Sequence, residues 1–308
     1  MLFLNTGIDG LQLGLCYAIV ALGMYIAYSI LDFPDLTTDG SFPLGGVIGT
    51  ILLYNAGMPP VLALMGAFMS GMLMGAMTGL LHVKFGISKL LAGIIVMTGL
   101  LSITLALTTV LTGTGYPVTD FSYVANNIDG LFNGDSGVMD DWWIIAILAV
   151  IVIIVKILMD LFLKSKLGFM LIATGNNEIL VNSLGKDTGF YKILGLGIAN
   201  GLVGLAGALY AQLTMNYDNT SGSGKVVLAL ASVIIGLSLF SKVKFVKPTT
   251  AVIIGAVIYA LCLNYFTLID QTGTYLKLMN AVCFALILIS NNAFKLKHVK
   301  NKKEVMLK

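Results

Sequence analysis

Long stretches without a charged side chain alternate with short polar segments along the chain. The charge-free stretches are residues 40–83, 90–119, 142–155, 193–217, 226–241, 248–269 and 278–294. Because about 20 apolar residues span a bilayer, most of these stretches can hold one membrane helix and the first can hold two. The pattern predicts about nine hydrophobic elements, at residues 7–31, 42–55, 60–82, 89–112, 142–163, 190–214, 226–240, 248–269 and 275–294.

The composition indicates that the chain is surrounded by lipid. Of its 308 residues, 57% are hydrophobic and 11% are charged, whereas soluble domains carry about 25% charged residues. We therefore expect an all-α polytopic integral membrane protein with about eight or nine transmembrane elements, forming one transmembrane domain over residues 1–308.

Two residue types argue against other classes of protein. All 18 basic residues are lysines, so the chain lacks the bidentate phosphate-binding residue arginine, and we expect no nucleic acid partner. Cys16, Cys262 and Cys283 each lie in an apolar run, where a thiol behaves as a small hydrophobe. We expect neither a disulfide nor a metal site from them.

The distribution of charge predicts the orientation in the membrane. Lysines gather in three segments, which face the cytoplasm by the positive-inside rule. Residues 113–141 carry five aspartates and no lysine, and Trp142 and Trp143 follow as an interfacial anchor, so this loop is expected outside. An odd number of crossings then places the N-terminus outside and the C-terminus in the cytoplasm. We expect a multi-pass protein of the plasma membrane. The lysines are Lys164, Lys166, Lys186 and Lys192, then Lys242, Lys244 and Lys247, and finally six in the tail 295–308.

Two hydrophobic elements are too short for an ordinary span. Each has about 15 residues against the roughly 20 needed, and each follows a polar break that contains glycine, at residues 32–41 and 216–224. Unsatisfied backbone in hydrocarbon is costly, so such breaks belong beside a watery cavity or inside protein. We therefore take their polar residues as candidates for a translocation pathway, with solvated loops as the alternative for both breaks. The candidates are Asp32, Asp35, Thr37, Thr38, Asp39, Asn216, Asp218 and Asn219.

The surroundings of the two breaks resemble each other. Gly14, Gly23 and Ala27 have counterparts at one constant offset, Gly195, Gly204 and Ala208, and the short elements are followed by Pro60 and Pro248. In the predicted topology the two halves, residues 7–112 and 190–294, run in opposite directions. Inverted halves with interrupted helices indicate a transport pathway, although glycine-rich membrane helices can also align by chance.

The cytoplasmic loop 164–189 contains one predicted short helix between Gly175 and Gly185. Asn176 or Asn177 can cap its first turn, Glu178 suits the positive end of the helix dipole, and Gly185 can stop it. Its apolar residues can seat in a groove of a soluble partner or lie on the lipid surface. These apolar residues are Ile179, Leu180 and Leu184.

Several segments carry a resemblance to a known family. Residues 13–23, the loop 167–188 and the glycine-rich segment 195–209 resemble the permease subunits of branched-chain amino acid type ABC importers, which include ribose and nucleoside permeases. Within this family, residues 33–42 and 90–98 look like the subgroup of tryptophan and tyrosine permeases. The chain departs from the common pattern at Lys89, where an uncharged residue is expected, and in having no arginine in its coupling loop.

The resemblance implies an ATP-driven importer of a small solute, an amino acid and in this subgroup an aromatic one. It implies a homodimeric membrane core, an extracytoplasmic substrate-binding lipoprotein and two ATPase subunits, which bind ATP and magnesium in place of this chain. The chain is then a transport subunit and not an enzyme. The ATPase-coupling residues carried over are Asn176, Asn177, Glu178, Leu180, Leu184 and Gly185.

Other mechanisms fit the sequence less well. The run 221–225 superficially resembles a phosphate-binding loop, but Asn219 stands where that motif needs glycine and Val226 where it needs Ser or Thr. The aspartates at 32, 35 and 39 face no second acidic cluster, so we expect no metal. An ion-coupled secondary transporter is the main alternative, and only the segment 32–39 offers the intramembrane ionisable residue that such proteins use.

Overall fold

The structure is a computed structural model that describes residues 2–112, 118–120, 131–134, 137–138, 141–241, 243, 245–268 and 278–289. Within these residues it is an all-α polytopic membrane protein, as predicted, with seven helices long and apolar enough to cross a membrane. Two short two-stranded pairs accompany the helices, β1 with β4 and β2 with β3. Most of the predicted outer loop 113–141, the basic tail 295–308, Lys242 and Lys244 lie outside the described residues.

Each of the nine predicted hydrophobic elements corresponds to helix in the described residues. The helices are α1 Leu2–Met24 with its continuation η1 Tyr25–Ile30, α2 Thr38–Thr50 with η2 Ile51–Asn55, α3 Pro60–Val83, α4 Lys89–Thr112, α6 Asp141–Lys164, α7 Lys166–Asn176, α8 Glu178–Ser183, α9 Thr188–Thr214, η3 Asn219–Gly222, α10 Lys225–Leu239, α11 Pro248–Thr267 and a last helix Leu278–Ile289. The strands are β1 Val118–Asp120, β2 Asn133–Gly134, β3 Gly137–Val138 and β4 Asn216–Asp218.

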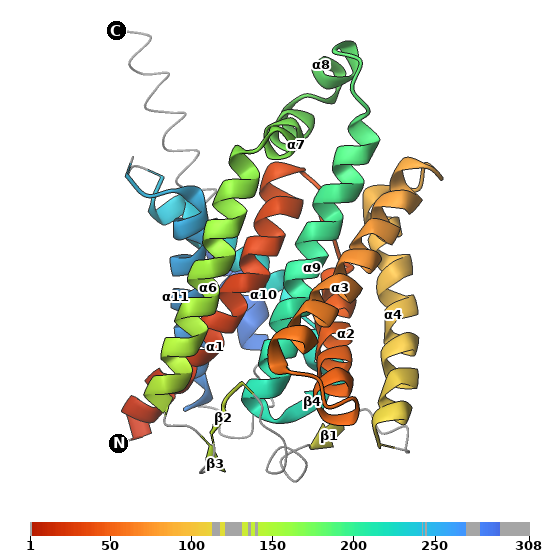
Figure 1. The fold of residues 1–308 in the computed structure, drawn as a ribbon. Coiled ribbons are helices and arrows are strands. Elements are labelled where there is room, and N and C mark those ends of the chain that lie inside the picture. The colour runs from red at the N-terminus through yellow and green to blue at the C-terminus, as the bar shows by residue number, and fades with distance from the viewer. Residues whose placement is uncertain are drawn as a thin grey trace, which may run out of the picture.

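The long helices run between two ends of the bundle (Figure 1). α1 starts at the end that also holds β4, here called the β4 end, and α9 descends to it from the opposite end, here called the α8 end. The start of α6 lies at the β4 end, whereas α7 and α8 lie at the α8 end. α1 and α9 are therefore antiparallel.

Small residues bring the helices close together. The most extensive helix contacts of the described chain are α3 with α9 and α1 with α11. A Cβ added at Gly75 on α3 would lie 2.1 Å from the carbonyl oxygen of Leu196 on α9. A Cβ added at Gly45 on α2 would lie 1.9 Å from the carbonyl oxygen of Gly204. Such close backbone approach is how membrane helices gain packing energy without a hydrophobic driving force.

Three predicted boundaries were wrong. α1 begins at Leu2 and not at residue 7, because the apolar Leu2, Phe3 and Leu4 continue the helix. The first break ends at Thr37, so residues 38–41 belong to α2, where burial against neighbouring helices overrides their low helix propensity. The loop 164–189 holds two helices, because the Ser165 side chain caps α7 and the extended backbone of Asn177 separates α7 from α8. Gly175 consequently lies inside α7.

Candidate functional site

The first break, residues 31–37, connects η1 to α2 and turns sharply at its start. Asp32 is exposed and adopts a left-handed φ of 50°. The Nζ atom of Lys89, the lysine that departs from the family pattern, donates a hydrogen bond to the Asp32 carbonyl oxygen (2.8 Å). Lys89 thus provides a partner for one of the carbonyl groups that the end of a helix leaves unsatisfied.

Asp35 is the centre of a buried polar network. The Thr37 N–H donates to Asp35 Oδ1 (2.9 Å), and Asn200 Nδ2 on α9 donates to Asp35 Oδ2 (2.6 Å). Ser41 Oγ on α2 donates in turn to Asn200 Oδ1 (2.8 Å). The hydroxyls of Thr37 and Thr78 on α3 share a hydrogen bond of 2.7 Å. The network therefore ties the first break to α3 and α9.

Most of the candidate residues from the first break lie in or beside this buried network. Asp35, Thr37 and Thr38 have no exposed surface, and Thr38 Oγ1 donates to the Asp35 carbonyl oxygen (3.2 Å). Asp39 is partly buried, and only Asp32 faces the exterior. Polar groups of the first break are thus satisfied by protein, which is one of the two environments that membrane backbone requires.

The second break, residues 215–224, runs along the β4 end. Its strand β4 pairs antiparallel with β1, Asn216 is exposed, and the Asp218 side chain caps η3 by accepting from the Thr220 N–H (2.7 Å). Tyr217 is buried, and burial raises the pKa of its phenol to about 12. The neutral phenol donates to Asn219 Oδ1 (3.1 Å), which also accepts from Thr104 on α4.

The end of the first break meets the second break at Asp39, the second residue of α2. Its Oδ1 accepts from the Val226 N–H (2.8 Å) and its Oδ2 from the Gly224 N–H (3.1 Å). The Asp39 carboxylate of α2 therefore caps the N-terminus of α10, where the helix dipole favours a negative charge. A Cβ added at Gly222 would lie 1.9 Å from the Asp39 carbonyl oxygen, so the two segments also touch through their backbones.

Sequence reasoning missed Lys225, the first residue of α10. Its side chain is buried with 9% exposure, and its Nζ donates to the Tyr17 hydroxyl (2.8 Å). The ammonium lies 4.1 Å from the ring centre of Tyr17, 4.9 Å from that of Phe42 and 5.1 Å from that of Tyr210. The available signal was a single lysine at the start of a half-helix, far from the cytoplasmic clusters in the predicted topology.

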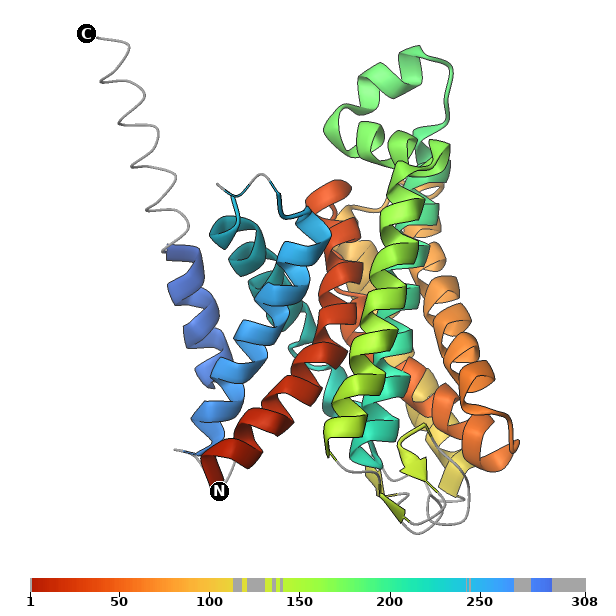
Figure 2. The same cartoon turned by 60° about the vertical axis from the view of Figure 1, so that its left-hand side comes forward.

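Residues 166–185, part of the predicted coupling loop and called the coupling segment below, contain α7 and α8 and project beyond the α8 end of the bundle (Figure 2). Asn177 is the cap of α8, because its Oδ1 accepts from the Leu180 N–H (3.1 Å); the alternative, Asn176, ends α7. Glu178 forms an ion pair of 2.7 Å with Lys192 on α9. Gly185 has a φ of 71°, the left-handed conformation that commonly ends a helix.

The apolar residues of α8 face outward. Ile179, Leu180 and Leu184 are 82%, 55% and 65% exposed, whereas Val181 is buried. Helix α8 is therefore held to the protein on one side and leaves an apolar surface on the other. Large exposed apolar surfaces on a projecting element are typical of sites for a protein partner or a membrane.

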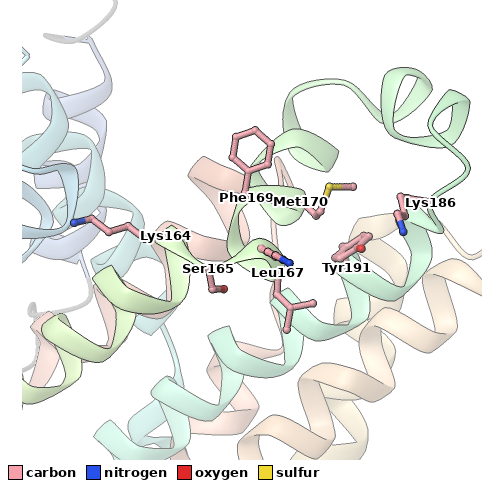
Figure 3. A pocket seen from close by; sticks show the side chains of 8 residues that line it. Lys164, Ser165, Leu167, Phe169, Met170, Lys186 and Tyr191 are labelled. Atoms are coloured by element: carbon pink, nitrogen blue, oxygen red, sulfur yellow. The ribbon is translucent and has the colours of Figure 1, made fainter.

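A cavity of about 470 Å³ lies at the base of the coupling segment (Figure 3). In the close-up, Met170, Lys186 and Tyr191 lie together, and Lys164 extends away from them. Three lysines and no carboxylate contribute to its wall, which favours an anionic surface or ligand. The lining residues are Lys164, Ser165, Lys166, Leu167, Phe169, Met170, Lys186 and Tyr191.

A bundle of apolar helices with two interrupted, polar segments is typical of membrane transport proteins. Residues 8–290 match the family model described as branched-chain amino acid transport system / permease component, and the chain belongs to this family. The resemblance carried by the sequence motifs is confirmed. The chain is thus an ABC transporter permease component.

Relatives cover almost the whole chain. It is 41% identical over 278 residues to the tyrosine transport system permease protein of Clostridioides difficile, covering 90% of this chain and 88% of the relative. An uncharacterized protein of Rickettsia prowazekii is 30% identical over 93% of this chain and 98% of its own length. The ribose import permease protein of Haemophilus influenzae is 26% identical over 89% of this chain and 81% of its own length.

Proposed function

We propose that this chain is the membrane-spanning subunit of an ATP-driven importer for an aromatic amino acid, with tyrosine as the first solute to test. Membership of the permease family supports the transport role, and similarity to a tyrosine transport system permease supports the choice of solute. In this proposal two partner ATPase subunits bind ATP and magnesium, and the chain itself carries out no chemical step.

The observation that carries the ATP-driven mechanism is the coupling segment. Helix α8 is fixed by the Asn177 cap and by the Glu178–Lys192 ion pair, yet it exposes Leu180 and Leu184. A short rigid helix with an apolar face fits a groove in a soluble partner. The ATPase subunits therefore dock on α8, so the α8 end faces the cytoplasm and the N-terminus of α1 lies outside.

The solute passes where the two breaks meet. We treat α1–α3 and α9–α11 as inverted repeats, because α3 packs along α9 in the way that α11 packs along α1. A pathway between inverted repeats lies at their interface, which in this chain is the contact of Asp39 with the start of α10. A substrate-binding lipoprotein delivers solute at the β4 end, and a second copy of the chain completes the membrane core.

One observation favours ion-coupled secondary transport as a second candidate. Asp35 is fully buried, and no described lysine or histidine forms an ion pair with it. A buried carboxyl group in the membrane is a common proton or ion relay. Its hydrogen bonds to Thr37 and Asn200 give it a structural role that needs no transported ion.

Reconstitution in proteoliposomes separates the two candidates. The chain is purified with its ATPase, the binding protein is added, and uptake of labelled tyrosine, ribose and a nucleoside is measured. We expect tyrosine uptake that requires hydrolysable ATP and the binding protein. Uptake by the chain alone, driven by a sodium or proton gradient, would establish the secondary transporter instead.

The coupling surface is tested in the same system. Replacing both Leu180 and Leu184 by Ala should weaken co-purification of the ATPase and lower ATP-dependent uptake, because the apolar anchors are lost. The matched control replaces Leu158 and Leu161 on α6, which are equally exposed and face lipid in this proposal. Equal ATPase binding by both double variants would mean that α8 is not the docking helix.

A further inference from the structure

The Lys225 ammonium lies where four helices from both proposed repeats come together. Tyr17 belongs to α1, Phe42 to α2, Tyr210 to α9 and Lys225 to α10. The side chain starts next to the backbone groups that Asp39 caps. Any movement that separates the first break from the second therefore changes the surroundings of this ammonium.

The charge of Lys225 is only partly compensated. Among the described residues its Nζ has one hydrogen-bond partner, the Tyr17 hydroxyl, although an ammonium carries three donors. No carboxylate of the described residues lies within ion-pair distance of it. Asp39 is near enough to attract it electrostatically, but both oxygens of that carboxylate already accept backbone hydrogen bonds.

Three aromatic rings supply the rest of the compensation. Cation–π contacts stabilise a desolvated ammonium, but they supply no acceptor for its unused N–H donors. A buried charge normally needs a hydrogen-bonded anionic partner. A cation with unused donors at a proposed transport pathway is thus matched to a transported anionic group. A carboxylate fits best, because it accepts two or more charge-assisted hydrogen bonds.

We propose that Lys225 binds the carboxylate of the solute when the two breaks separate, and that Tyr17 and Tyr210 then contact its apolar or aromatic part. This inference rests on the proposed importer function and names the solute class of its pathway: small carboxylates with an aromatic side chain. While the breaks are in contact, the three aromatic rings contact the ammonium and no solute is bound to it.

The contacts also explain how the site becomes accessible. Phe42 and Asp39 both lie on α2, whereas Lys225 starts α10. Separation of α2 from α10 breaks the two hydrogen bonds to Asp39 and removes the Phe42 ring from the ammonium. Tyr17 and Tyr210 stack on each other, with ring centres 6.2 Å apart, and they remain as the wall of the opened site.

The test compares Lys225→Met, Lys225→Gln and Lys225→Arg with the wild type in the reconstituted complex, with the exposed Lys84→Met as the matched control. ATP-dependent tyrosine uptake by the wild type tests the proposed function on its own. Because the binding protein is the same in every assay, differences between variants belong to the permease. Assembly is checked by ATPase co-purification and by the thermal unfolding midpoint.

We expect both neutral variants to assemble and to raise the KM for tyrosine about tenfold, the loss of one charged contact, while Lys225→Arg, which keeps the charge and can donate to a carboxylate, stays within about threefold. In the wild type, tyrosinamide, which lacks the carboxylate, should be taken up less well than tyrosine. In the neutral variants this difference should disappear. A neutral variant with wild-type KM and wild-type discrimination would overturn the proposal. Failure of both neutral variants to assemble would also overturn it, because the ammonium would then serve the fold.

Discussion

The first break, residues 31–37, satisfies its polar groups with side chains from three helices, whereas the second break, residues 215–224, relies on a short strand pair, on the caps that Asp218 and Asp39 provide and on one contact of Asn219 with α4. Asp35 and Thr37 are fully buried and bonded to α3 and α9. Asn216 and Thr220 in the second break are exposed. The same need, partners for backbone that leaves a helix, is met in two different ways.

This difference indicates which segment moves. Opening the first break would expose Asp35 and Asn200, a buried polar pair that is costly to leave without partners. Opening the contact between the breaks removes two hydrogen bonds to a carboxylate that is itself partly exposed and one contact between the Phe42 ring and Lys225. We therefore expect the first break to behave as a fixed part of the α2, α3 and α9 unit, and the second break to move against it.

The largest expected effect comes from filling two equally tight backbone contacts. An added Cβ would lie 1.9 Å from a carbonyl oxygen at Gly45, between α2 and α9, and also at Gly222 in the second break. We expect Gly45→Ala to cost about 3 kcal/mol of unfolding free energy, since packed helices cannot relax. Gly222→Ala should cost about 1 kcal/mol, because the second break can shift. Unfolding in mixed detergent micelles measures both.

The control for this pair is Gly99→Ala on α4. An added Cβ there meets nothing within 4 Å, and alanine is the better helix former, so stability should stay the same or rise. Equal losses at Gly45 and Gly222 would show that the two breaks are equally rigid and would remove the proposed difference between them.

A second comparison uses the aspartates at the two ends of the first break. Asp35→Asn replaces one acceptor oxygen by a donor, so it leaves either Thr37 or Asn200 without its hydrogen bond, at a cost of about 2 kcal/mol. Asp32→Asn should change stability by less than about 0.5 kcal/mol, because Asp32 is exposed and asparagine tolerates its left-handed backbone. Thermal unfolding of the purified variants distinguishes them, and a larger loss at Asp32 would contradict the assignment.

Of these three comparisons, the smallest loss of stability is expected at the contact between the breaks. Asp39→Ala removes the cap of the 15-residue helix α10, which should cost about 1 kcal/mol, but it should alter ATP-dependent uptake strongly because this contact is proposed to open. The control Asp218→Ala removes the cap of the four-residue η3 and should leave uptake near wild type. Normal uptake with Asp39→Ala would take this residue out of the pathway.

Most helices could be predicted from sequence because proline or charged residues mark their ends. Pro60 and Lys89 begin α3 and α4 at the predicted residues, since proline favours a first helical turn and charged residues mark the membrane border. The start of α2 was predicted too late, because its first residues are polar and become helical only by burial against α3 and α9. Local propensity does not contain that tertiary contribution.

The candidate site was predictable only in part. Polar residues at the two breaks could be found from their spacing, but the sequence does not show that Asp39 reaches α10 or that Asp35 reaches Asn200, 165 positions away. Lys225 was missed because its aromatic partners come from three other helices. Such clusters depend on helix packing, which the hydrophobic pattern alone does not specify.

The central claim, that solute passes where the two breaks meet, can be tested by the accessibility of one side chain. Val226 on α10 is buried, and its N–H donates to Asp39 in this contact. In a background without Cys16, Cys262 and Cys283, Val226→Cys is treated with a small water-soluble thiol reagent, with the buried Ser232→Cys further along α10 as control. We predict that only Val226→Cys is modified, and only while the complete complex hydrolyses ATP. A complex that imports tyrosine while Val226→Cys stays unmodified would contradict the account.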